Sequence, residues 1–303
     1  MGVIRVCDSS IPKMSSVSTM NAPEELVLAL PDLTLGGLRW GGGNQTKVLA
    51  VHGWLDNAAT FSQLAPLLAE RDCEVVAIDL PGHGNSQHRP RGCSYHLMDY
   101  LREVHQVLDY LGWKEPVLLG HSLGGIIGMM LCVAAPARVA KLILLESLGP
   151  ITAEPEAMPD NLRKALARAL REPSVKRTYK TITDAARDRM NGFGKISEEA
   201  AQRLVTRNLQ ATDQGYQWKS DPRLLWPSFI RLTETQVNTC LQALSLPVHL
   251  VAASKGYVPV AADKNPRLTY LRTAQVDEVA GGHHFHLDGD VDKTAQCIAQ
   301  FLC

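Results

Sequence analysis

The sequence predicts an α/β protein in which helices cover both faces of a mostly parallel sheet. Short apolar runs of strand length alternate with longer segments of helical periodicity, which is typical of a parallel sheet buried on both faces. One strand-to-helix junction, Gly120–Gly124, carries a serine with glycines two residues before and after it. Between residues 149 and 244, charged helical patterns interrupt the alternation. These observations predict one α/β core with an inserted helical cap.

The expected elements follow from these periodicities. Strands are expected at 47–51, 74–78, 116–119, 141–145, 248–252 and within 268–279, with an antiparallel edge strand at 34–40. Helices are expected at 58–70, 95–111, 122–135 and 291–302, and in the cap at 160–171, 174–190 and 198–210, where no strand pattern is found. The core is therefore assigned to 25–148 and 245–303, and the cap to 149–244. Residues 1–24 are assigned to a disordered leader, within which Met20 is an alternative start.

Composition excludes several classes of protein. A chain of 303 residues with 45% hydrophobic content can bury one sizeable core. Its 31 basic and 31 acidic residues cancel, so we expect no nucleic-acid partner and no membrane partner. No apolar run is long enough for a membrane helix, and the first 20 residues do not resemble a secretory signal. Seven scattered cysteines favour a reducing cytoplasm, and the chain is compatible with a monomer or a homodimer.

The glycine-flanked serine has the pattern of a nucleophile elbow, G-x-S-x-G. In that tight strand-to-helix turn only glycines fit beside the serine, and its Oγ is pushed out above the sheet near a helix N-terminus. Ser122 would then be a nucleophile, with Gly120 and Gly124 shaping the turn. The alternative is an ordinary helix N-cap serine, which the strand–turn–helix context disfavours.

A histidine near the C-terminus is the candidate base. His283 directly follows Gly281 and Gly282, so a flexible loop can deliver its imidazole to the serine. His286 is expected to support this loop, and His284 to pack or to face solvent. Three histidines within four residues have poor geometry for one metal ion, and no Cys or Glu stands at ligand spacing. We therefore expect no metal and no organic cofactor.

The strand at 47–51 ends in a loop that can hold negative charge. In proteins built on the elbow, one loop N–H and the N–H after the nucleophile bind the oxyanion. Here these would be the amides of Trp54 and Leu123. The residues expected to support the site are His52, Gly53, Gly120, His121 and Gly124.

Four motifs stand in a characteristic order: His52-Gly53-Trp54, Asp79–Ser86, Gly120–Gly125 and Gly282-His283. From about Leu26 onward the chain thereby resembles the α/β-hydrolase superfamily. The run His52–Ala58 and the pair Gly256-Tyr257 are similar to those of the serine hydrolase-like proteins. The resemblance implies a Ser–acid–His triad in that chain order and a helical cap. Asp79, which also ends a strand before a turn-rich loop, is expected to be structural.

The acid is where this chain departs from the pattern. In most relatives it follows the strand before the histidine segment, but here Ala253 follows that strand and the next carboxylate is Asp263. Glu146, directly after the strand at 141–145, stands where some branches carry their acid, and we favour it over Asp263. Two alternatives remain: Glu146 as a buried structural carboxylate, and a site in which no acid works.

The resemblance implies cleavage of an ester-type bond in a small, largely apolar substrate through an acyl-enzyme. Thioester, lactone or C–C bond hydrolysis on the same triad are alternatives, as is a weakly active ligand-binding or signalling homologue. The serine nucleophile argues against haloalkane dehalogenases and epoxide hydrolases, which need an aspartate. Candidate pocket walls in the cap are Met158, Met190, Phe193, Tyr216, Trp218, Trp226 and Phe229.

Overall fold

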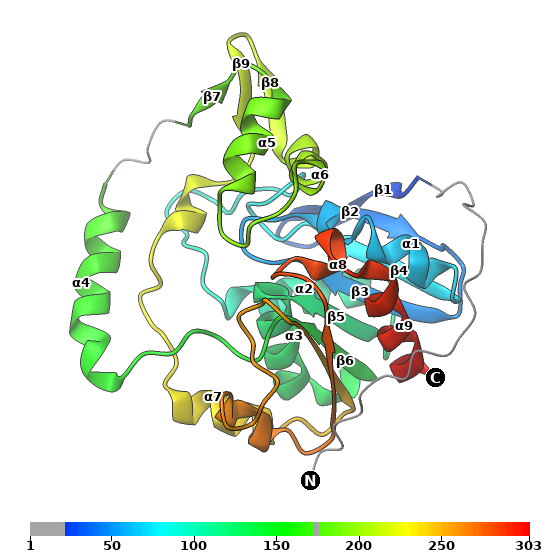
Figure 1. Ribbon diagram of the computed structural model, residues 1–303. Coiled ribbons are helices and arrows are strands. Elements are labelled where there is room, and N and C mark those ends of the chain that lie inside the picture. The colour runs from blue at the N-terminus through cyan, green and yellow to red at the C-terminus, as the bar shows by residue number, and fades with distance from the viewer. Residues whose placement is uncertain (1–21, 172–175) are drawn as a thin grey trace.

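An eight-stranded sheet runs through the middle of the protein, which we describe from a computed structural model covering residues 22–171 and 176–303 (Figure 1). Its strand order is β1-β2-β4-β3-β5-β6-β10-β11. The first two strands pair antiparallel, β2 also pairs antiparallel with β4, and every later neighbour is parallel. The bounds are β1 Glu24–Ala29, β2 Thr34–Trp40, β3 Thr46–Val51, β4 Cys73–Ile78, β5 Val117–His121, β6 Lys141–Leu145, β10 Val248–Ala253 and β11 Ala274–Val279.

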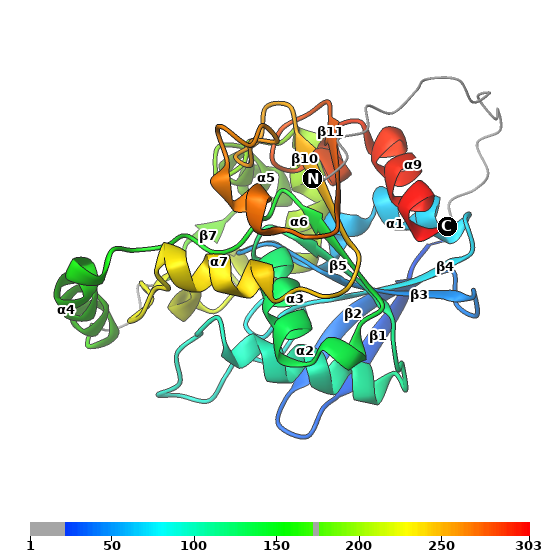
Figure 2. The same cartoon turned by 90° about the horizontal axis from the view of Figure 1, so that it is seen from below.

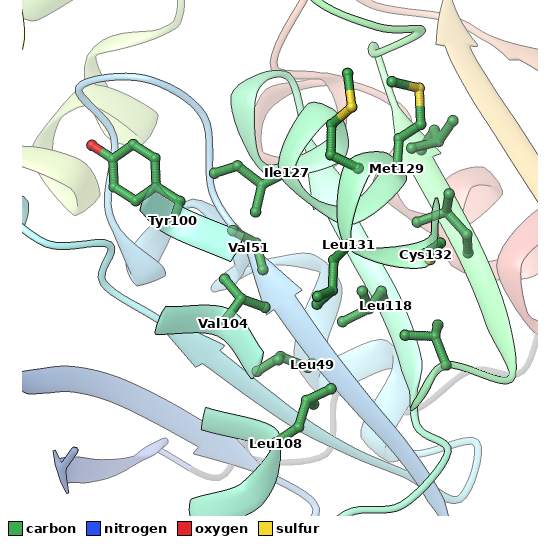
Figure 3. Packing of buried hydrophobic residues seen from close by; sticks show 14 of the residues in the cluster. Leu49, Val51, Tyr100, Val104, Leu108, Leu118, Ile127, Met129, Leu131 and Cys132 are labelled. Atoms are coloured by element: carbon green, nitrogen blue, oxygen red, sulfur yellow. The ribbon is translucent and has the colours of Figure 1, made fainter. Parts of the chain in front are cut away.

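Helices cover both faces of this sheet (Figure 2). One face carries α2 (Asp99–Tyr110), α3 (Leu123–Ala134) and α7 (Glu234–Gln242), and the other carries α1 (Leu64–Ala69) and α9 (Val291–Leu302). Successive side chains of a strand point to opposite faces. On β3, Leu49 and Val51 accordingly join the buried cluster under α2 and α3 (Figure 3), whereas Val48 and Ala50 join the cluster under α1 and α9. The expected fold class is confirmed.

Two parts of the core differ from the expected elements. β1 was not expected, because only Leu28 of this strand is buried and the segment lacks a clear apolar alternation; its pairing with β2 nevertheless completes the edge. The helix expected at 58–70 is divided into a 3₁₀ turn, η1 (Ala58–Phe61), and the short α1. The strand expected within 268–279 is confirmed as β11, and the turn η5 (Pro266–Tyr270) precedes it.

The region between β6 and α7 contains helices, as expected, and also strands, which were not. The helices are α4 (Met158–Ala169), α5 (Ile182–Met190) and α6 (Glu198–Asn208), with the 3₁₀ turns η3 (Pro155–Ala157) and η4 (Pro222–Leu225). The expectation of no strands is wrong: β7 (Thr178–Tyr179), β8 (Leu209–Thr212) and β9 (Gly215–Trp218) form an antiparallel sheet. These strands are too short to show a period, and Gly215 adopts the positive φ of 127° that their hairpin requires.

The helix expected at 174–190 begins only at Ile182. Thr181 caps it, because its hydroxyl accepts the N–H of Asp184 while the Asp184 carboxylate accepts the N–H of Thr181. The start of the expected helix partly lies outside the described residues, as does the expected leader up to residue 21.

A buried arginine ties α6 to the sheet. Arg207 donates to both carboxylate oxygens of Asp79, at 3.1 and 2.9 Å, and to both oxygens of Glu25, at 2.7 and 3.0 Å. Asp79 also accepts the N–H groups of Ala58 at 2.7 Å and Asn85 at 2.9 Å. Asp79 is therefore a fully bonded buried carboxylate, which fits the structural role expected for it.

Removing this arginine should destabilise the protein strongly. Arg207→Met leaves the Asp79 carboxylate buried without its cation, so we expect the free energy of unfolding to fall by about 3–5 kcal/mol. Urea titration followed by circular dichroism measures this. The matched control is Arg187→Met on α5, which removes an exposed pair with Asp184 and should cost less than about 1 kcal/mol. Equal losses in the two variants would contradict the role of Arg207.

Candidate active site

Ser122 sits in a strained turn between β5 and α3. Its φ of 50° and ψ of −114° lie in a region that non-glycine residues seldom occupy, and such strain persists where the surroundings enforce it. The Ser122 N–H donates to the carbonyl of Leu145 on the neighbouring strand at 3.0 Å. Any Cβ on Gly124 would collide with the backbone of Val51, and any Cβ on Gly120 would collide with that of Gly124. The elbow therefore requires both glycines.

His283 and Glu146 form a buried pair beside this serine. The Nδ1 of His283 lies 3.4 Å from Oε2 of Glu146, so Nδ1–H donates to the carboxylate and Nε2 is the nitrogen left to act as a base. His283 belongs to the loop between β11 and the short helix α8 (Phe285–Asp288), whereas Glu146 directly follows β6. Ser122 and His283 line the same small cavity.

The loop after β10 binds the Glu146 carboxylate with its backbone. The N–H of Ala253 donates to Oε1 at 2.7 Å, and the N–H of Tyr257 donates to Oε2 at 2.8 Å. Any Cβ on Gly256 would collide with the carboxylate, so glycine is required there. The segment that lacks a carboxylate directly after its strand thus holds the carboxylate from the neighbouring strand. Asp263 is exposed and, within the described residues, makes no hydrogen bond or ion pair with His283.

Two histidines fix the loop that follows β3. The Nδ1–H of His52 donates to the carbonyl of Gly53 at 2.7 Å, and Nε2 of His52 accepts the N–H of Leu80. His83 makes the same two kinds of hydrogen bond. Its Nδ1–H donates to the carbonyl of Pro81, and its Nε2 accepts the N–H of Leu55 at 3.2 Å. Both rings are therefore neutral, with the proton on Nδ1. Burial lowers the pKa of His52, and it lowers that of His83 to about 3.

This loop leaves the expected oxyanion donors available. Hydrogen bonds within and to this loop use the carbonyl of Gly53 and the N–H groups of Leu55 and Asp56. In the described part of the chain, no hydrogen bond uses the N–H of Trp54. Leu123 is the first residue of α3, so its N–H has no acceptor within that helix. Two backbone donors thus remain for a ligand beside Ser122.

A buried ion pair between α5 and the core was not foreseen from the sequence. Asp56 accepts the Nε2–H of His284 and a guanidinium N–H of Arg189, both at 2.9 Å. Burial opposes ionisation of Asp56, but His284 and Arg189 outweigh it and hold its pKa well below the usual range. His284 is therefore buried and bonded. The only sequence signal was the position of Asp56 within the run that resembles the serine hydrolase-like proteins.

The same cluster has the residue types of a metal site. Possible ligand atoms of Asp56, His121 and His284 all lie within 4.8 Å of one another. However, the Arg189 guanidinium also lies 3.1 Å from Nε2 of His284, so it already supplies the positive charge at this position. The arrangement is accounted for as an ion pair between cap and core.

Two further histidines near the site, His121 and His286, support it. His121 donates from Nε2 to the carbonyl of His283 at 3.0 Å, which fixes the backbone of the base. His286 lies 3.0 Å from the hydroxyl of Thr60, which fits its expected supporting role. Burial lowers the pKa of both rings well below the ordinary value, so both stay neutral.

The cavity at the serine is small, with a volume of about 20 Å³. Its lining consists of Gly53, Trp54, Asp56, His121, Ser122, Arg189, Phe193, His283 and His284. Of the aromatic and methionine side chains expected to form the pocket walls, Phe193 lines this cavity. Met190, Tyr216 and Trp218 instead pack against the buried cluster of the cap. A larger crevice of about 410 Å³ lies at the opposite edge of the sheet, near Lys47, Lys114 and Lys141. It contains no nucleophile–base pair, so chemistry is assigned to the smaller cavity.

Comparisons agree with this architecture. Residues 47–290 match the family described as alpha/beta hydrolase fold. The serine hydrolase-like protein of Danio rerio is 30% identical, covering 97% of this chain and 92% of the relative. Serine hydrolase-like protein 2 of Homo sapiens is also 30% identical, covering 95% and 97%.

Solved structures show the same fold. A hypothetical protein from Pseudomonas aeruginosa PAO1 has a TM-score of 0.87 and 39% identity, covering 92% of this chain and 99% of that one. The thioesterase domain from the curacin biosynthetic pathway has a TM-score of 0.81 and 25% identity, covering 93% and 100%.

The sheet order and the strained serine elbow define an α/β hydrolase, and the chain belongs to that family. Within the family, its curated relatives of about 30% identity are serine hydrolase-like proteins. The resemblance stated from the four motifs is thereby confirmed.

The neutral buried histidines predict a loss of stability in acid. Between pH 6.5 and about 3, His83 binds a proton in the unfolded chain but not in the folded one. Stability therefore falls as pH falls through this window, by about 1.4 kcal/mol per pH unit for each such group. Replacing His83 with glutamine keeps an acceptor for Leu55 and should reduce the slope by about that amount. Urea unfolding at several pH values measures it, and an unchanged slope would contradict the assignment.

Proposed function

We propose that this chain is a carboxylic ester hydrolase that works through an acyl-enzyme. The observation that carries the proposal is that a serine in a strained elbow shares one cavity with a histidine whose Nδ1 faces a buried carboxylate. This arrangement supplies a nucleophile, a base and a group that stabilises the charged base.

The reaction follows from these positions. Ser122 Oγ attacks the carbonyl carbon while His283 takes the hydroxyl proton at Nε2, and Glu146 stabilises the imidazolium. The amides of Trp54 and Leu123 bind the oxyanion. The imidazolium then gives its proton to the departing alkoxide, which leaves as the alcohol. His283 then takes a proton from a water molecule, which attacks the acyl carbonyl. The imidazolium returns that proton to Ser122 Oγ as the acyl–oxygen bond breaks and the carboxylic acid leaves.

The surroundings support a small, largely apolar substrate. Trp54, Phe193 and Tyr257 are exposed by 44%, 60% and 60%. The rings of Phe193 and Tyr257 stack at 5.1 Å, and each also contacts the ring of His283. An aromatic surface beside the base suits an apolar group of the substrate. We keep the cytoplasm as the proposed location, supported by the free thiols of the described cysteines.

Among the alternative substrates, a thioester is favoured by the similarity to one solved structure. The thioesterase domain from the curacin pathway is similar over nearly the whole chain, and attack on a thioester uses the same triad and oxyanion donors. No specific observation favours lactone hydrolysis, C–C bond hydrolysis or a weakly active binding homologue. Comparing the hydrolysis rates of an oxygen ester and a thioester of the same acyl group distinguishes an ester hydrolase from a thioesterase.

Loss of the nucleophile should abolish both labelling and turnover. A fluorophosphonate probe should label the wild type and fail to label Ser122→Ala, and hydrolysis of p-nitrophenyl acetate and butyrate should fall on the order of 10⁴-fold or more. Ser147→Ala, which changes a buried serine that donates to the carbonyl of Ser122, is the control and should still label. Absence of labelling in the wild type would support the binding homologue.

The two candidate acids can be separated by isosteric amides. Glu146→Gln keeps the shape of the side chain but cannot stabilise the imidazolium, so we expect kcat for p-nitrophenyl acetate to fall on the order of 10²–10⁴-fold. Asp263→Asn changes an exposed residue and should leave kcat within about twofold. The reverse result would transfer the role to Asp263.

A further inference from the structure

Exposed apolar side chains are concentrated on one part of the molecule. Among the described residues, those large apolar side chains that are exposed lie mainly on the cap or at the mouth of the active site, with Val27, Met98 and Tyr110 elsewhere. We define the cap patch as Ile151, Leu162, Leu166, Leu170, Leu225 and Ile230. Scattered exposed apolar residues are ordinary, whereas a group of them in one region of the fold points to an interaction surface.

Half of the cap patch lies on one side of α4 and at its C-terminal end. Leu162, Leu166 and Leu170 follow each other at intervals of four residues, so they share one flank, and they are exposed by 41%, 52% and 78%. Ala165 faces the protein and is buried. Both ribbon views place α4 at the periphery (Figures 1 and 2). The helix therefore packs by one face and leaves a second apolar flank in water.

The segment 222–232 connects α4 to the active-site mouth. The guanidinium of Arg168 on α4 lies 5.8 Å from the ring centre of Trp226. The indole N–H of Trp54, at the mouth, donates to the carbonyl of Leu224 at 3.0 Å. Leu225 lies between these two contacts in sequence. Segment 222–232 therefore links α4, which carries half of the cap patch, to the mouth of the active site.

Helix α4 carries an excess of positive charge although the chain is neutral overall, while Glu154 and Glu156 stand exposed just before it. From Met158 to Arg171, four basic residues stand against one acidic residue, and they are Arg163, Lys164, Arg168 and Arg171 against Asp160. An amphipathic helix with a leucine flank and basic neighbours is typical of a segment that lies in a membrane interface. Each basic side chain near an anionic surface adds attraction, which falls with ionic strength.

We propose that the cap patch docks on an anionic lipid surface and turns the active-site mouth toward it. This rests on the proposed function and refines its substrate class to amphiphilic esters that partition into lipid. Leu162, Leu166 and Leu170 enter the interface, and Lys164 and Arg171 contact the headgroups. We expected no membrane partner because the total charge of the chain is zero. Total charge does not show a local excess of basic residues on one helix.

Vesicle binding tests the docking. The full chain should co-sediment with phosphatidylcholine vesicles containing about 30 mol % phosphatidylserine, more weakly with phosphatidylcholine alone, and more weakly at high salt. The triple variant Leu162→Gln, Leu166→Gln, Leu170→Gln should lose at least about tenfold in apparent affinity. The control Val27→Gln, Met98→Gln changes exposed apolar residues outside the cap patch and should bind like wild type. Equal binding by both variants would overturn the proposal.

Further measurements separate the other outcomes. Sedimentation velocity without vesicles should give the same oligomeric state for wild type and triple variant; a dimer that the triple variant breaks, without vesicle binding, would make this face a self-association interface and overturn the docking. Ser122→Ala should bind vesicles like wild type. Turnover of soluble p-nitrophenyl acetate should not change in the triple variant. Vesicle binding by a wild type that hydrolyses no ester would contradict the proposed function alone.

Discussion

The carboxyl edge of the parallel sheet is the constraint on which the site depends. Two adjacent strands, β5 and β6, each end in a non-glycine residue with positive φ, Ser122 at 50° and Glu146 at 49°. Each donates its N–H to the next strand at 3.0 Å, Ser122 to Leu145 and Glu146 to Val251. Because sheet hydrogen bonds impose both conformations, the packed core stabilises the strain, and the nucleophile and the carboxylate emerge at one edge.

Buried polar groups surround this edge, and those nearest the carboxylate and the serine loop are held by specific partners. The carboxylate of Glu146 takes two backbone N–H groups as well as His283, and His52 and His83 are neutral rings that hold the loop next to the serine. In a low dielectric, such hydrogen-bonded networks keep a geometry that isolated side chains would not. The price of this arrangement is sensitivity to acid, since protonating these rings favours the unfolded chain.

The cap is joined to the core by charge and leaves apolar surface outside. Arg207 and Arg189 each bring a guanidinium from a cap helix to a buried core carboxylate, Asp79 and Asp56 respectively. These bonds orient α5 and α6 over the cavity, whereas α4 is held mainly through its inner face.

The sequence by itself determined the alternating core, the serine elbow and the order of the motifs, because strand apolarity and glycine requirements are local properties. It also placed Glu146 at a strand end, from the absence of a carboxylate after Ala252. Only the tertiary structure decided that the loop at Gly256 wraps that carboxylate, that Asp56 meets Arg189 across 133 positions of chain, and that the cap contains a small sheet. Such contacts depend on which distant segments the fold brings together, and strands of two to four residues carry too little pattern to be recognised beforehand.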